Sequence, residues 1–250
     1  MSAEIVVSVI SAVVALASVY LTARAAQRTA RFSHQLDLET TRATKEQQVE
    51  ELMSRYREPL LRAAFDLQSR IWNIIRQGFF VRYGVGGKDH EREYARENTL
   101  FLFAQYFSWV EILRRQVQFL DLGDVERNRL FVDRLERIAD TFASDRQVQD
   151  AGFRLFRGEQ RALGEVMMAP GDNSGPGCQC MGYAEFHARL HGDPSFARWF
   201  EPLGDHVSAL AHDDAPCYER LTQLQHALID LIAFLDDPPR RFLPEHLTQL

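Results

Sequence analysis

Near the start of the chain, residues 5–23 are hydrophobic apart from a few Ser and Thr residues. This run contains no charged residue, glycine or proline. As an α-helix this run is about 28 Å long, which matches the hydrocarbon core of a lipid bilayer. The hydroxyl groups of its Ser and Thr residues can bond back to the helix backbone, so they do not prevent burial in lipid. The pattern predicts a transmembrane anchor within residues 1–23 that contacts the bilayer through residues 5–23.

Basic residues follow this run and none precedes it, since Arg24, Arg28 and Arg31 all lie on its C-terminal side. The positive-inside rule then predicts a single-pass protein of the inner or plasma membrane, with the N-terminus outside and the rest cytoplasmic. The three arginines are expected to contact anionic lipid headgroups. A cleaved signal peptide is the alternative, because residues 23–25 have the small-x-small spacing of a cleavage site, although the charge order is the reverse of a secretory signal.

No glycine or proline occurs between the anchor and Pro59, so residues 24–58 are expected to continue the anchor as a long helical stalk. The apolar residues of the stalk follow a near-heptad pattern, but Glu39 and Glu46 occupy two positions that would complete the seam. A weak coiled coil and an isolated, solvated helix both fit this pattern. Rows of Ser and Ala in the anchor would also let two anchors pack closely, so a homodimer is one expectation.

Beyond residue 58, apolar residues recur at helical spacing and no segment alternates convincingly with the period of a strand. This pattern predicts an all-α fold, a multi-helix bundle over residues 59–250. Pro59, Asp89 and Asp124 mark helix starts, and the irregular segment 169–182 is a candidate functional loop or subdomain boundary. The predicted helices cover residues 59–83, 90–122, 125–143, 148–168, 183–192, 193–200 and about 215–235.

Three of these helices carry specific expectations. The helix after Asp89 has more aromatic residues in its middle than one face can hold, so it is expected to run through the centre of the bundle. Gly158 and Gly164 each weaken their helix by about 1 kcal/mol relative to Ala, which indicates a close helix crossing or a bend. Leucines from Leu221 to Leu235 keep a spacing of three and four residues. An intramolecular core is their expected use, and an intermolecular zipper is the alternative.

Composition narrows the choice of partners. The formal net charge is -6, whereas a nucleic-acid partner requires a basic face, so no nucleic acid is expected to bind. Nearly all of the 29 basic residues are arginine, which we interpret as the codon usage of a GC-rich bacterial genome. The three cysteines are an odd number without framework spacing, and they are expected to be free thiols.

The best candidate for chemistry is the pair Cys178 and Cys180, followed by His187 and His191. Two histidines four residues apart on a helix face the same side, and two thiolates would complete a tetrahedral zinc site, with Cys217 as a substitute ligand. Cysteine pairs that bind zinc usually have two or more residues between them. The one residue between Cys178 and Cys180 would therefore strain a zinc chelate formed by both thiolates. The alternative is a loop with incidental cysteines and surface histidines, and no cofactor.

Other polar groups have structural explanations. The pair at residues 212–213, His-Asp, resembles a ligand pair of metal-dependent phosphohydrolases, but it also fits a helix end followed by an N-cap. Phosphate-binding loops, nucleophile elbows and His-Glu-x-x-His motifs are absent from the sequence. Four acids lie among apolar residues with a basic or polar residue one helical turn away, so salt-bridged packing is expected. These acids are Asp66, Glu111, Glu159 and Asp230.

The sequence therefore predicts a membrane-anchored cytoplasmic helical protein that acts by protein-protein interaction, as a scaffold, adaptor or signalling partner without catalytic activity. The anchor would raise the effective concentration of the protein near membrane-bound partners, whose identity the sequence does not give. The alternative function is a membrane-tethered metalloprotein or hydrolase with its site around residues 178–191.

Overall fold

The structure, a computed structural model, divides the chain into two compact units, residues 1–51 and residues 52–250. Each unit is described by itself. The residues described are 18, 20, 22, 24, 40, 41, 44, 56–116, 125–145, 152–170, 178–211, 218–236, 242 and 247–250.

Most of the predicted anchor and stalk lies outside the described residues. Those that are described in the first unit, such as Ser18 and Thr22, are helical and exposed. The Thr22 hydroxyl donates a hydrogen bond to the Ser18 carbonyl oxygen at 2.7 Å, which is the back-bonding expected from the sequence. Within the described part of the chain, no helix has the length and apolar character needed to cross a membrane.

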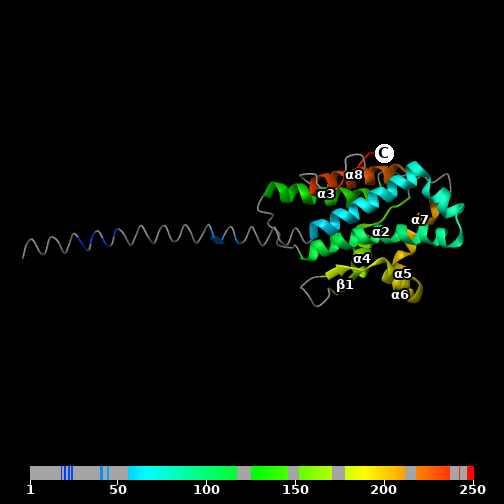
Figure 1. The fold of residues 1–250 in the computed structure, drawn as a ribbon, viewed down its shortest axis with the longest axis horizontal. Helices are drawn as coiled ribbons and strands as arrows, with labels where there is room; N and C mark the ends of the chain where they lie inside the picture. The colour runs from blue at the N-terminus through cyan, green and yellow to red at the C-terminus, as the bar shows by residue number, and fades with distance from the viewer. Residues whose placement is uncertain are drawn as a thin grey trace, which may run out of the picture. The chain divides into compact units, whose positions relative to one another are not determined.

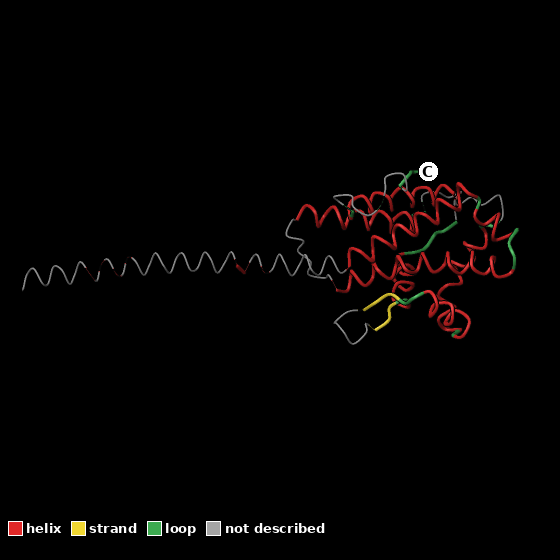
Figure 2. The backbone as a smooth tube through the Cα atoms, viewed as in Figure 1, coloured by secondary structure: helices red, strands yellow, loops and turns green. Residues whose placement is uncertain are grey.

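The second unit is mostly helical, as the predicted all-α class requires, and Figures 1 and 2 show its helices packed side by side. A first helix covers residues 56–77. The elements that follow are the π-helix η1 (Phe80–Val85), α2 (Asp89–Gln116), α3 (Val125–Ala143), α4 (Arg157–Val166), β1 (Met168–Pro170), β2 (Cys178–Cys180), α5 (Tyr183–Gly192), α6 (Pro194–Ala197), the 3₁₀-helix η2 (Arg198–Phe200), α7 (Glu201–Ala209) and α8 (Tyr218–Leu235).

Helix α2 runs through the centre of this unit, as its aromatic residues predicted. It contacts η1, α4, α5, α7 and β2. Phe101, Phe103, Tyr106 and Phe107 are all buried, and the ring of Phe103 lies 5.4 Å from that of Phe153 and 6.0 Å from that of Phe142. Rings on several sides of one helix anchor several neighbours, because each ring removes a large apolar area from water.

Helix α8 packs against α3 (Figure 1). It buries its leucine stripe inside the same unit. Its leucines are at most 2 % exposed. The stripe therefore belongs to the intramolecular core, and the zipper alternative is wrong. The buried leucines are Leu221, Leu224, Leu228, Leu231 and Leu235.

The first predicted helix, residues 59–83, differs from the observed one at both ends. Tyr56 is already helical and buried, so the helix is formed before Pro59. It ends at Gln77 because Gly78 adopts a φ of +60°, the left-handed conformation that terminates helices at glycine. The chain then continues as η1 up to Val85.

The predicted helix 148–168 is shorter in the structure, where α4 begins only at Arg157. Phe153 has a φ of +55°, which breaks the helical path, and the Leu155 amide donates to the Phe142 carbonyl oxygen at 3.1 Å. Both Phe153 and Leu155 are buried. Burial of these two apolar side chains in the core therefore outweighs the helical spacing of the sequence.

A short antiparallel hairpin replaces part of the loop expected over residues 169–182 (Figure 2). Strands β1 and β2 pair with Met168 opposite Cys180 and Pro170 opposite Cys178. Three-residue strands are too short to show a period of two in the sequence, so the pattern could not reveal them. The hairpin leads directly into α5.

Of the two glycines in α4, only Gly164 lies at a close helix crossing. A Cβ atom at Gly164 would lie 2.6 Å from the Phe107 carbonyl oxygen and 3.0 Å from the Glu111 Cβ atom on α2. A Cβ atom at Gly158 would meet nothing within 4 Å. The expected crossing is confirmed at Gly164, whereas Gly158 has no packing role.

These two glycines provide a matched test of the crossing. Gly164→Ala is expected to destabilise the protein by about 1–3 kcal/mol, because α4 must move away from the α2 backbone. Gly158→Ala is expected to stabilise it by up to about 1 kcal/mol, because alanine favours the helix and meets no obstacle. Urea unfolding of both variants measures the difference, and equal effects would contradict this packing.

Candidate metal centre

Two helices each contribute a pair of side chains to one polar cluster on the second unit. His187 and His191 lie one turn apart on α5, and Glu93 and Glu97 lie one turn apart on α2. Residues four apart share a helix face, so each pair points in one direction. Their ligand atoms all lie within 4.8 Å of one another, and we call these four residues the Glu-His cluster.

Aromatic packing fixes the rotation of α5 against α2. Phe186 on α5 is fully buried, and its ring lies 5.6 Å from that of Phe101 on α2 and 5.1 Å from that of Phe200. Tyr183 packs against Phe101 at 5.3 Å. Because Phe186 must face inward, His187 and His191 are carried to the edge of the interface that faces Glu93 and Glu97.

The end of α5 is also fixed. The Asp193 carboxylate accepts hydrogen bonds from the Ser195 and Phe196 amides at 3.0 and 3.1 Å, which caps α6. The Phe196 hydrogen bond, with those from Arg189 and Ser195, holds the pKa of Asp193 below its ordinary value. The turn into α6 therefore begins one residue after Gly192, and α5 cannot extend past it.

The Nε2 atoms of both histidines approach both carboxylates. For His187, Nε2 lies 3.4 Å from Glu93 Oε1 and 3.5 Å from Glu97 Oε2. For His191, Nε2 lies 3.6 Å from Glu93 Oε1 and 3.0 Å from Glu97 Oε1. Four nitrogen and oxygen ligands about 2.1 Å from an ion at a tetrahedral site lie about 3.4 Å apart. The four nitrogen–oxygen separations, 3.0–3.6 Å, are therefore close to those around a single bound ion.

Glu97 is the unusual member because its carboxylate is buried without a permanent counter-charge. Its side chain is 4 % exposed, and Oε2 has no hydrogen-bond partner. The basic groups that pair with it among the described residues are the two imidazoles, which are charged only when protonated. A buried carboxylate needs hydrogen bonds or a cation to offset its lost hydration.

Glu111, further along the same helix, shows how a buried carboxylate is normally compensated in this fold. Its side chain is 3 % exposed, and it accepts hydrogen bonds from Arg114 at 2.6 Å and Arg115 at 2.7 Å. Burial opposes its ionisation, but the two guanidinium groups outweigh burial and hold the pKa of Glu111 below its ordinary value. No arginine takes this role among the described partners of Glu97.

The surroundings of the Glu-His cluster are polar and shield it from solvent on one side only. The ring of Tyr183 lies 6.3 Å from that of His187, and burial together with Glu97 and the other nearby acids raises the pKa of Tyr183. The phenol therefore stays protonated and neutral at physiological pH. Glu93 and both histidines are about half exposed, so the cluster opens to solvent on one side.

Of the four predicted metal ligands, the structure brings His187 and His191 together but places Cys180 elsewhere. The Cys180 thiol is partly buried beside Ser108 of α2, and this burial raises its pKa to about 11. Ser108 lies eleven residues after Glu97, which is about 16 Å along the helix. Cys180 is thus not part of the cluster, and the predicted set is corrected at this position. The side chain of Cys178, like residue 217, lies outside the described residues.

Sequence reasoning missed Glu93 and Glu97, although they have the same i, i+4 spacing as the two histidines. The signal was present in the segment from Glu93 to Glu97, but paired acids are common on exposed helix faces. Only the contact between α2 and α5 shows that the two pairs meet.

The other acids singled out from the sequence have structural roles. Glu159 accepts a hydrogen bond from the Phe156 amide at 2.7 Å at the start of α4. Asp230 pairs with Arg137 of α3 at 3.1 Å rather than with His226. Burial raises the pKa of Asp66, and Arg62 opposes that shift. Residues 212–213 lie outside the described part of the chain.

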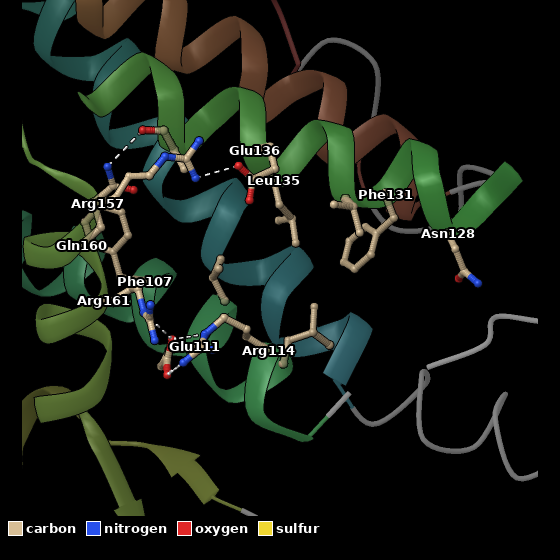
Figure 3. A pocket seen from close by; sticks show the side chains of 14 residues that line it. Phe107, Glu111, Arg114, Asn128, Phe131, Leu135, Glu136, Arg157, Gln160 and Arg161 are labelled. Atoms are coloured by element: carbon tan, nitrogen blue, oxygen red, sulfur yellow. Dashed lines mark hydrogen bonds and ion pairs between the residues drawn. The ribbon is translucent and has the colours of Figure 1, made fainter. Parts of the chain in front are cut away.

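A cavity of about 550 Å³ lies between α2, α3 and α4 (Figure 3). Its wall is mainly apolar, with Phe107, Phe131 and Leu135 among the lining residues. The carboxylates at its edge are already paired, Glu111 with Arg114 and Glu136 with Arg157 at 2.6 Å. Among its described lining residues, the cavity therefore offers apolar volume but no unpaired acid for catalysis.

Comparisons with protein-family models, with curated proteins and with solved structures found no match to this chain.

Proposed function

We propose that this protein binds a divalent transition-metal ion, zinc in the first instance, through the Glu-His cluster. The observation that supports this proposal is the buried Glu97 carboxylate: its Oε2 lacks a hydrogen bond and faces His187, and its Oε1 faces His191. A divalent cation at this point would offset the charge of Glu97 and use the nitrogen atoms that face it.

The donor atoms favour zinc or a similar ion. Two imidazoles and two carboxylates form a nitrogen and oxygen set without sulfur, and imidazole suits zinc, iron and nickel better than it suits magnesium or calcium. The spacing of 3.0–3.6 Å between nitrogen and oxygen atoms fits metal-ligand bonds of about 2.1 Å. An ion-paired cluster without metal is the competing explanation, and it requires protonated histidines.

Zinc binding to the full-length protein tests the proposal. Zinc at about 100 times its dissociation constant is expected to stabilise the chelator-treated protein by about 2.7 kcal/mol, because only the folded state holds the residues of the Glu-His cluster together. Calorimetry should give one zinc per chain. His187→Ala and His191→Ala should each remove the stabilisation.

Matched surface variants provide the control. His90 and Glu185 are exposed residues of α2 and α5, so His90→Ala and Glu185→Gln should retain zinc binding. Metal-free folded protein that gains no stability from zinc, cobalt or manganese would contradict a metal-binding function.

The sequence supports a membrane tether as a second part of this proposal, in which residues 5–23 hold the helical unit near the bilayer and Arg24, Arg28 and Arg31 contact anionic headgroups. An interaction role as a scaffold or adaptor, with an unidentified protein partner or a second copy, is compatible with tethering. The cytoplasmic orientation follows from the same charge order, and the bacterial source follows from the arginine usage; both are proposed with the tether.

Cell fractionation tests the tether. The full-length protein is expected in the membrane pellet after an alkaline wash, because the uncharged run stays in lipid, and deletion of residues 1–23 should release it. Recovery of the intact chain in the wash, or a mature protein that begins near residue 26, would contradict the membrane tether. Neither result would affect the metal-binding proposal.

A further inference from the structure

The two carboxylates of the Glu-His cluster are not equivalent. Glu97 is 4 % exposed and directs one oxygen to each histidine, with Oε1 at 3.0 Å from His191 and Oε2 at 3.5 Å from His187. Glu93 is 49 % exposed, and a single oxygen, Oε1, lies 3.4 and 3.6 Å from the two histidines. One carboxylate is therefore held by the core, and the other reaches the cluster from the solvent side.

We propose that His187, His191 and Glu97 are the protein ligands of the metal, and that the fourth coordination position is open to solvent beside Glu93. This inference rests on the proposed metal-binding function. Water occupies the open position at rest, and a small molecule with a carboxylate or hydroxamate oxygen can replace it. Three protein ligands with one exchangeable position are typical of catalytic zinc sites, whereas structural sites are closed by four.

Burial supports this division of roles. Glu97 needs a cation to offset its buried charge, whereas Glu93 is well hydrated without one. Holding a half-exposed glutamate in one conformation also costs side-chain entropy. A hydrogen bond from metal-bound water to Glu93 satisfies that carboxylate without direct coordination, so Glu93 is a positioning residue for the exchangeable ligand.

Exposure of the cluster supports the open position. His187 is 44 % exposed and His191 is 54 % exposed, so the solvent side of an ion between them is not covered by the described residues of α2 and α5. The site is thus suited to a small oxygen-donor ligand.

Cobalt-substituted full-length protein provides the test, because the visible spectrum of Co²⁺ reports its coordination. Glu97→Gln is expected to weaken cobalt binding by more than about 100-fold, as the loss of a direct ligand. Glu93→Gln should weaken it less, by about 10- to 100-fold, as expected for a residue outside the coordination shell. Acetohydroxamate added to the wild-type cobalt protein should change the spectrum, because it displaces water from the open position.

The outcomes separate this inference from the proposed function. Tight cobalt binding with equal losses in Glu93→Gln and Glu97→Gln, or a wild-type spectrum that acetohydroxamate leaves unchanged, means a closed four-ligand site and overturns the open position alone. Absence of cobalt binding in the wild-type protein overturns the metal-binding function. The acetohydroxamate measurement needs no variant, so it decides the question even if Glu97→Gln fails to fold.

Discussion

The central position of α2 is the constraint on which the rest of the helical unit depends. A helix of 28 residues that contacts neighbours on several sides must also carry polar residues into the interior. Two of them are carboxylates, Glu97 and Glu111, and both are almost fully buried. Arginines of the same helix compensate Glu111, but histidines of another helix face Glu97. This difference between two acids on one helix distinguishes a packing ion pair from a candidate metal site.

The same packing that buries α2 also assembles the Glu-His cluster. Phe186 enters the aromatic core beside Phe101, which sets the rotation of α5 and directs its two histidines towards α2. The cluster thus lies on rigid helices rather than on loops, and its geometry is maintained by apolar contacts that do not depend on a metal. Pre-positioned ligands lower the entropy cost of binding an ion.

The sequence predicted those features that depend on local pattern. The bounds of α5, the central path of α2 and the buried leucines of α8 all follow from apolar residues at helical spacing. The left-handed turn at Phe153 was missed because long-range burial overrides local preference there, and the short hairpin was missed because three-residue strands show no period in the sequence. Glu93 and Glu97 were missed for a related reason: sequence spacing gives the face of each helix, but not which faces meet.

The central claim is that the Glu97 carboxylate of α2, not a cysteine thiolate, coordinates an ion held by His187 and His191. X-ray absorption at the zinc edge of the zinc-loaded full-length protein tests this most directly, since Zn–N and Zn–O bonds are about 2.0–2.1 Å long and Zn–S bonds about 2.3 Å. The account predicts a first shell of nitrogen and oxygen only, with the outer-shell scattering of two imidazoles. A sulfur shell at the longer distance would contradict it.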